Sequence, residues 1–202
     1  MLRKVKARIK GFTLIELLVV MAIIAFLMLA SLAGLTYGLK KARDTSRQRA
    51  VATIQTALLS YYNDNLQFPS YTQITALGGT CTSIGGSIYR CDVTPLVGLN
   101  ATGDGFASNR TSSPLYKYFE EGFRSPIAIT AGKDLDRAMG YYVNSDATQY
   151  AICTLTELDT SGNVTPHSSV TADGDTWGCY CLGSLAEDVA CNGLEDPTGV
   201  QD

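Results

Sequence analysis

The chain has 202 residues, of which 46% are hydrophobic, and a formal net charge of -3 at pH 7. That length allows one domain, or one domain plus an appended segment. The modest net charge hides an uneven distribution, because the residues after position 50 contain 6 Lys and Arg against 17 Asp and Glu, a net of -11. This acidic region has no broad attraction for DNA or anionic lipid, so we expect no nucleic-acid partner.

A basic leader precedes a long apolar run. Five basic residues lie before Gly11, namely Arg3, Lys4, Lys6, Arg8 and Lys10. Residues 12–39 contain a single charged residue, Glu16. The run is longer than the roughly 7 to 15 residues of a signal-peptide core and no A-x-A site bounds it, which argues against a secretory signal peptide. It exceeds the roughly 20 apolar residues that cross a bilayer, and the basic leader predicts a cytoplasmic N-terminus.

The helical pattern continues beyond the apolar run. Apolar residues recur at steps of three and four, at Val51, Ile54, Leu58 and Tyr61, which is typical of an amphipathic helix. The first proline is Pro69, so nothing interrupts a single helix from about Phe12 to Asn65, roughly 80 Å long. We expect residues 12–39 to form its membrane-spanning half and residues 40–68 its amphipathic half.

Residues 69–202 are predicted to form a globular head. Short helices are expected after Ser70 and at 113–122, where serines stand at the capping positions. Strands are expected at 139–144, 149–157 and 176–182, with a polar loop at 159–175. The sequence therefore predicts an α+β fold in which an antiparallel sheet of three or four strands packs on the amphipathic half of the helix.

The stretch GFTLIE at 11–16, behind a basic leader and before an apolar helix, resembles the N-terminus of the type IV pilin family, which includes the pseudopilins of type II secretion. The resemblance is strongest over residues 10–30 and looser over 42–70. It implies a pilin-like fold and a prepilin peptidase that cuts between Gly11 and Phe12, after which Phe12 is N-methylated. It also implies that Glu16 is the assembly residue, which meets the N-terminal ammonium of a neighbouring subunit.

Physical chemistry supports this role for Glu16. A lone carboxylate at the bilayer centre costs about 3 kcal/mol, and less near the end of the segment. Pairing it with an ammonium removes much of that penalty, so the charge favours addition to a filament over an isolated subunit. The alternative is that Glu16 marks the interfacial end of a plain membrane anchor. Gly34 and Gly38 form a small-xxx-small pair that could let helices approach closely.

All six cysteines follow the apolar run, at Cys81, Cys91, Cys153, Cys179, Cys181 and Cys191. An even number in an oxidising compartment predicts up to three disulfides. Cys81 and Cys91 bracket a Gly-rich loop that could close locally. Cys179 and Cys181 share one face of a predicted strand and are poorly placed to bond each other, so Cys153 and Cys191 remain as their partners.

Metal and catalytic sites are weakly indicated. The C-x-C spacing and a single His, His167, do not favour zinc. Asp173, Asp175 and Asp196 are weak calcium candidates, suggested by calcium binding in some pseudopilins, but they do not fit the EF-hand pattern. No motif for a nucleophile, a zinc protease or a phosphate loop occurs. We therefore expect no enzymatic activity and no cofactor.

The sequence thus predicts a structural subunit that polymerises through its N-terminal helix into a type IV pilus or a type II secretion pseudopilus. The resemblance implies as partners a prepilin peptidase, an assembly ATPase acting through a platform protein, and other pilins. It also implies residence in the inner membrane before assembly and in an extracellular pilus or periplasmic pseudopilus afterwards. Two alternatives stay open: a minor pilin serving as a tip adhesin or in DNA uptake, and a single-pass anchored domain that never polymerises.

Overall fold

The computed structural model describes residues 12–99, 110–119, 138–164, 171–172 and 175–194. The chain divides into two compact units, Met1–Leu39 and Lys40–Asp202. One helix, α1 (Leu14–Asn65), runs through the boundary between them. The single long helix predicted from the sequence is therefore confirmed, although it begins two residues after Phe12.

The first unit contains the apolar part of α1. Every described side chain in residues 12–29 is exposed, and the large apolar ones range from 41% at Ile24 to 82% at Leu14. By length and composition alone, α1 could cross a membrane. Its apolar residues therefore have no cover from the described part of the chain.

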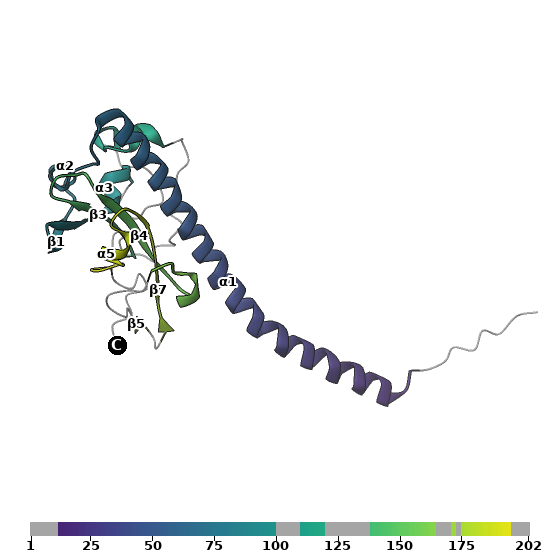
Figure 1. The fold of residues 1–202 in the computed structure, drawn as a ribbon. Coiled ribbons are helices and arrows are strands. Elements are labelled where there is room, and N and C mark those ends of the chain that lie inside the picture. The colour runs from purple at the N-terminus through teal and green to yellow at the C-terminus, as the bar shows by residue number, and fades with distance from the viewer. Residues whose placement is uncertain (1–11, 100–109, 120–137, 165–170, 173–174, 195–202) are drawn as a thin grey trace, which may run out of the picture. The chain divides into compact units, whose positions relative to one another are not determined.

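The second unit contains a five-stranded antiparallel sheet in the order β1-β2-β3-β4-β7 (Figure 1). Its strands are β1 (Cys81–Gly85), β2 (Ile88–Cys91), β3 (Met139–Asn144), β4 (Tyr150–Thr156) and β7 (Gly178–Gly183). A separate two-stranded ribbon pairs β5 (Thr171–Ala172) with β6 (Asp175–Thr176). The predicted α+β class is confirmed.

Short helices lie before, between and after the strands. They are α2 (Tyr71–Ala76), α3 (Val93–Val97), α5 (Ala186–Val189) and the 3₁₀ turns η1 (Arg110–Ser112), η2 (Tyr116–Tyr118) and η3 (Asp159–Ser161). The predicted helix after Ser70 is confirmed, and its start is a capping box between Ser70 and Gln73. Upstream, α1 ends where Leu66 adopts a left-handed conformation with φ 59°.

Four sequence predictions about the head were wrong. The stretch between Cys81 and Cys91 is a β-hairpin, not a loop, and its two-residue turn is formed by Gly86 and Ser87, which both have positive φ. This hairpin brings the sheet to five strands instead of three or four.

The described part of the helix expected at 113–122 is irregular apart from the 3₁₀ turn η2. Leu115 is fully buried, and Tyr118 and Phe119 pack against the main core as partly buried side chains. The expected polar loop at 159–175 likewise contains η3 and β5.

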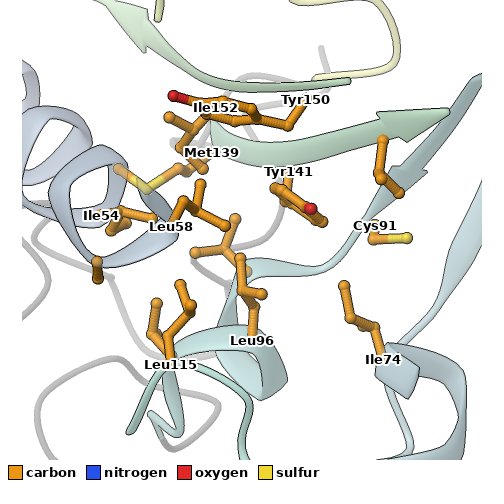
Figure 2. Close-up of a cluster of buried hydrophobic side chains, with 14 of the residues drawn as sticks. Ile54, Leu58, Ile74, Cys91, Leu96, Leu115, Met139, Tyr141, Tyr150 and Ile152 are labelled. Carbon is orange, nitrogen blue, oxygen red and sulfur yellow. The ribbon is translucent and has the colours of Figure 1, made fainter. Parts of the chain in front are cut away.

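The main core lies between the second half of α1 and one face of the sheet (Figure 2). Ile54 and Leu58 of α1 are fully buried there, as the amphipathic pattern predicts. Residues alternate along β4, so that Ile152 points into this core while Cys153 and Leu155 belong to a second buried cluster. Because both faces are covered, β4 is buried along its whole length.

Candidate assembly site at the start of the long helix

Thr13 and Glu16 form a reciprocal cap at the start of α1. The backbone N–H and the hydroxyl of Thr13 donate to Oε2 of Glu16 at 2.9 and 2.8 Å. In return, the backbone N–H of Glu16 donates to Oγ1 of Thr13 at 3.4 Å. This is a capping box, which satisfies N–H groups that the first helical turn leaves without partners. The T-x-x-E spacing could have revealed it in the sequence, but the sequence interpretation considered only the charge of Glu16.

The carboxylate of Glu16 lies on an exposed apolar face of α1. Phe12, Ile15, Val19 and Val20 line a shallow groove along the helix together with it. Phe12 is 77% exposed. Within the described residues, the hydrogen bonds of the Glu16 side chain all come from Thr13, which is neutral. The negative charge of Glu16 is thus offset by no cation in that part of the chain.

The predicted cleavage site is only half described. Phe12 is the first described residue, and Gly11 lies outside the described residues. Cleavage between the two residues and methylation of Phe12 therefore remain predictions. The position of Phe12, two residues before α1 begins, would put a new amino group near the helix start and near Glu16 if that cleavage occurs.

A second polar site lies within the second unit, where α1 meets the end of β4. Asp44 is fully buried. Its carboxylate accepts the backbone N–H groups of Glu157 and Leu158 at 2.7 and 3.0 Å. These bonds satisfy the buried charge of Asp44. Because the two donors come directly after β4, they also attach the end of this strand to α1.

Two arginines complete this site. Arg43 Nε and Arg47 Nη2 both donate to Oε1 of Glu157, at 2.7 and 3.0 Å. The hydrogen bond to Glu157 raises the pKa of Arg43 above its ordinary value. The Arg47 guanidinium also lies 5.4 Å from the centre of the Trp177 ring. We call Arg43, Asp44, Arg47 and Glu157 the helix–strand clamp.

The end of α1 is held by a smaller polar contact. Asp64 Oδ2 accepts hydrogen bonds from the Tyr118 hydroxyl at 2.7 Å and from Lys117 Nζ at 3.0 Å. Both bonds lower the pKa of Asp64, and the bond from Tyr118 has the larger effect. The contact attaches η2 to the helix, although all three groups are near solvent.

The structure pairs all six cysteines, as Cys81–Cys91, Cys153–Cys181 and Cys179–Cys191. The first is the local closure that the sequence favours. Cys179 and Cys181 bond distant partners instead of each other, and Cys153 lies directly opposite Cys181 in the β4–β7 register. Zinc binds the thiolate form of cysteine, so the six cysteines offer no zinc ligands while they are paired in disulfides.

The calcium candidates cannot be placed. Asp173 and Asp196 lie outside the described residues, as does His167, and Asp175 is described only as part of the backbone of β6. A calcium site at these residues stays a sequence prediction.

Comparison with known proteins bears on the N-terminal end of the chain. Residues 6–32 match the family model described as the prokaryotic N-terminal methylation motif. The chain therefore carries the prepilin-type signal of type IV pilins and pseudopilins, and the resemblance seen in the sequence is confirmed there. The motif spans Gly11, Phe12 and Glu16, points to a structural and non-enzymatic family, and implies processing by a prepilin peptidase. No curated protein and no solved structure matches the chain.

Proposed function

We propose that this chain is a structural subunit that polymerises through α1 into a type IV pilus or a type II secretion pseudopilus. The observation that carries the proposal is Glu16, a carboxylate without a cationic partner in the described residues, on an exposed apolar helix face within a methylation motif. A charge in that position favours a state in which a partner supplies the missing cation.

The proposed life cycle uses four segments. Residues 1–11 are a basic leader that holds the N-terminus in the cytoplasm and is removed by the prepilin peptidase. Residues 12–39 span the inner membrane and then enter the filament core. Residues 40–68 pack on the head, and residues 69–202 form the head itself, outside the cytoplasm, where an oxidising compartment supports its three disulfides.

The proposed driving force for assembly has two parts, the pairing of the Glu16 charge and the burial of the apolar residues of α1. Cleavage after Gly11 creates an ammonium on Phe12, and the ammonium of one subunit pairs with Glu16 of its neighbour. At the same time, the exposed apolar residues of α1 pack against those of other copies. An assembly ATPase acting through a platform protein would extract the subunit from the membrane, and the acidic head would form the filament surface.

The mature N-terminus tests the proposal. Intact mass spectrometry of the membrane-extracted protein should find a chain that begins with N-methylated Phe12. Gly11→Val should block cleavage, because the branched side chain hinders access to the peptide bond. Gly34→Ala is the matched control, since an added Cβ there meets no atom within 4 Å, and it should be processed normally.

The possible outcomes separate this proposal from its alternatives. A leader still attached to folded, membrane-bound protein would contradict the pilin function and leave a plain single-pass anchor. A processed chain that occurs in sheared filaments only in trace amounts would instead indicate a minor subunit.

A further inference from the structure

The two edges of the five-stranded sheet differ in what pairs with them. β1 and β7 are its outer strands. On β7, the backbone N–H groups of Asn163 and Val164 donate to the carbonyl of Cys179 at 2.9 and 3.2 Å. The side-chain amide of Asn163 acts like a further peptide group, because it donates to the carbonyl of Cys181 and accepts from its N–H, both at 2.7 Å. The middle of the β7 edge is therefore already paired.

The outer edge of β1 has no such cover in the described part of the chain. β1 pairs with β2 on one side, and no other described strand pairs with it. The N–H of Asp92 donates to the carbonyl of Thr80 at 3.0 Å, so these two residues form a hydrogen-bonded pair at the base of the hairpin. Because such pairs alternate along an antiparallel ladder, the N–H and C=O groups of Cys81 and Ser83 point away from β2.

The residues of β1 offer no protection against pairing with another chain. Edge strands commonly carry lysine, proline or an inward-pointing charge that prevents such pairing. The sequence of β1 is CTSIG, which is uncharged and contains no proline, and Thr82 and Ser83 are exposed. The irregularity in the ladder falls between Ser83 and Gly85, so residues 81–83 form a regular strand that is open on its outer side.

We propose that β1 pairs with β1 of a second copy of this chain, antiparallel, around a two-fold axis at Thr82. Cys81 of each copy then lies opposite Ser83 of the other, and each of these pairs exchanges backbone hydrogen bonds through the groups that point away from β2. The two Thr82 side chains meet at the axis, where a charged residue would repel its own copy. Because the β7 edge is already paired, β1 is the edge that a second copy can offer.

The two-fold symmetry decides what this contact can join. Neighbours along one helical filament are related by a screw operation, so the contacts between them are heterologous. An isologous contact between two β1 strands therefore joins heads of different filaments, a consequence that rests on the proposed function. A contact of this length is weak by itself, but a filament presents many copies in a row, and their combined binding strengthens the association. The β1 edge thus bundles filaments laterally.

A cysteine at the proposed axis tests the pairing in the full-length chain, whether or not the chain forms filaments. Thr82→Cys puts two thiols opposite each other in a non-hydrogen-bonded pair, where Cα atoms lie about 4.5 Å apart, a separation that allows a disulfide. The native cysteines are all paired, so the introduced thiol is free. Under mild oxidation with copper phenanthroline in detergent, we expect at least about fivefold more disulfide-linked dimer than from Thr148→Cys, an exposed position between β3 and β4.

Ser83→Pro separates strand pairing from random collision. The N–H of Ser83 points away from β2, so proline removes a donor of the open edge and leaves the hairpin ladder intact. Added to Thr82→Cys, it should reduce the dimer to the level of Thr148→Cys. The proposal is overturned if Thr82→Cys yields no more dimer than this control, or if Ser83→Pro leaves the yield unchanged. Peptide mapping of the native Cys81–Cys91 disulfide establishes that the hairpin is folded in each variant.

Thr82→Lys tests the joining of filaments without a cross-link. The substitution places like charges opposite each other at the axis. Its filaments should stay in suspension at a centrifuge speed that pellets bundles of the wild type, whereas filaments of Thr148→Lys should pellet like the wild type. Dispersed wild-type filaments, or equal pelleting of the two variants, would overturn the bundling. A chain that forms no filaments would contradict the proposed function and the bundling with it, while the Thr82→Cys cross-link decides the pairing by itself.

Discussion

The two halves of α1 differ in what covers their apolar residues. In the first half, Leu18 is 61% exposed and Phe26 is 73% exposed. In the second half, Val51, Ile54 and Leu58 are completely buried against the sheet. Both halves are regular helix with apolar side chains, and only the second finds its partner in the described part of the same chain.

This difference shows how one helix can serve two purposes. Burial in the second half stabilises the head, and the helix–strand clamp begins just after the boundary at Leu39. The first half contributes nothing to that core, so its residues remain available to lipid or to other copies. The following predictions test whether stability belongs to the second half alone.

Asp44→Ala should have the largest effect on the head. The substitution removes the acceptor of two backbone N–H groups. It also removes one of the two carboxylates that balance the buried charge of Arg47. Breaking a buried pair of this kind costs about 3–5 kcal/mol. Urea unfolding followed by the fluorescence of Trp177, the single tryptophan, would measure it. Glu187→Ala, an exposed acidic residue in α5, should change little, and an equal loss in both variants would contradict the role of the clamp.

Leu58→Ala and Leu18→Ala compare the two halves directly. Leu58 is fully buried, so its truncation should cost about 2–5 kcal/mol of unfolding free energy. Leu18 is 61% exposed, so the same change should alter the unfolding of the head by no more than about 0.5 kcal/mol. The same urea titration in detergent measures both. A comparable loss from Leu18→Ala would mean that the first half also supports the head.

Asp64→Asn should have the smallest effect, and one that depends on pH. In the folded protein the pKa of Asp64 is below its ordinary value of 3.8, because the carboxylate accepts hydrogen bonds from Tyr118 and, with a smaller effect, from Lys117. The charged form is therefore favoured by folding, so its contribution is present above pH 3.8 and declines as the pH falls through the folded pKa. Because the group is exposed, the contribution is small. Thermal unfolding from neutral to acidic pH should show a shallower decline for Asp64→Asn than for the wild type.

Local patterns predicted much of the fold. The apolar periodicity predicted α1, a serine at a capping position predicted α2, and runs of strand-forming residues predicted β3 and β4. The hairpin of β1 and β2 was missed because its glycines indicate a loop unless the flanking residues are recognised as paired strands. In the candidate site, the charge of Glu16 was identified from the sequence, but its capping bond to Thr13 was not.

The helix–strand clamp could not have been predicted from the sequence. Asp44 and Glu157 are separated by 113 positions, and a basic cluster beside an apolar segment ordinarily indicates a solvated membrane flank. Only the fold shows that Arg43 and Arg47 face the carboxylate of Glu157, the residue that follows β4. Long-range polar pairs of this kind depend on topology, which no local pattern encodes.

The most direct test of the assembly proposal separates the charge of Glu16 from its cap. Glu16→Gln keeps a side chain that can cap the helix but removes the charge, whereas Thr13→Ala keeps the charge and removes the side-chain part of the cap. Sheared filaments should be assayed for this chain in both variants, after mass spectrometry has established that each is inserted and processed. We predict that Glu16→Gln is incorporated at least about tenfold less than wild type, while Thr13→Ala is incorporated nearly normally. Normal incorporation of Glu16→Gln would contradict the proposed pairing between subunits.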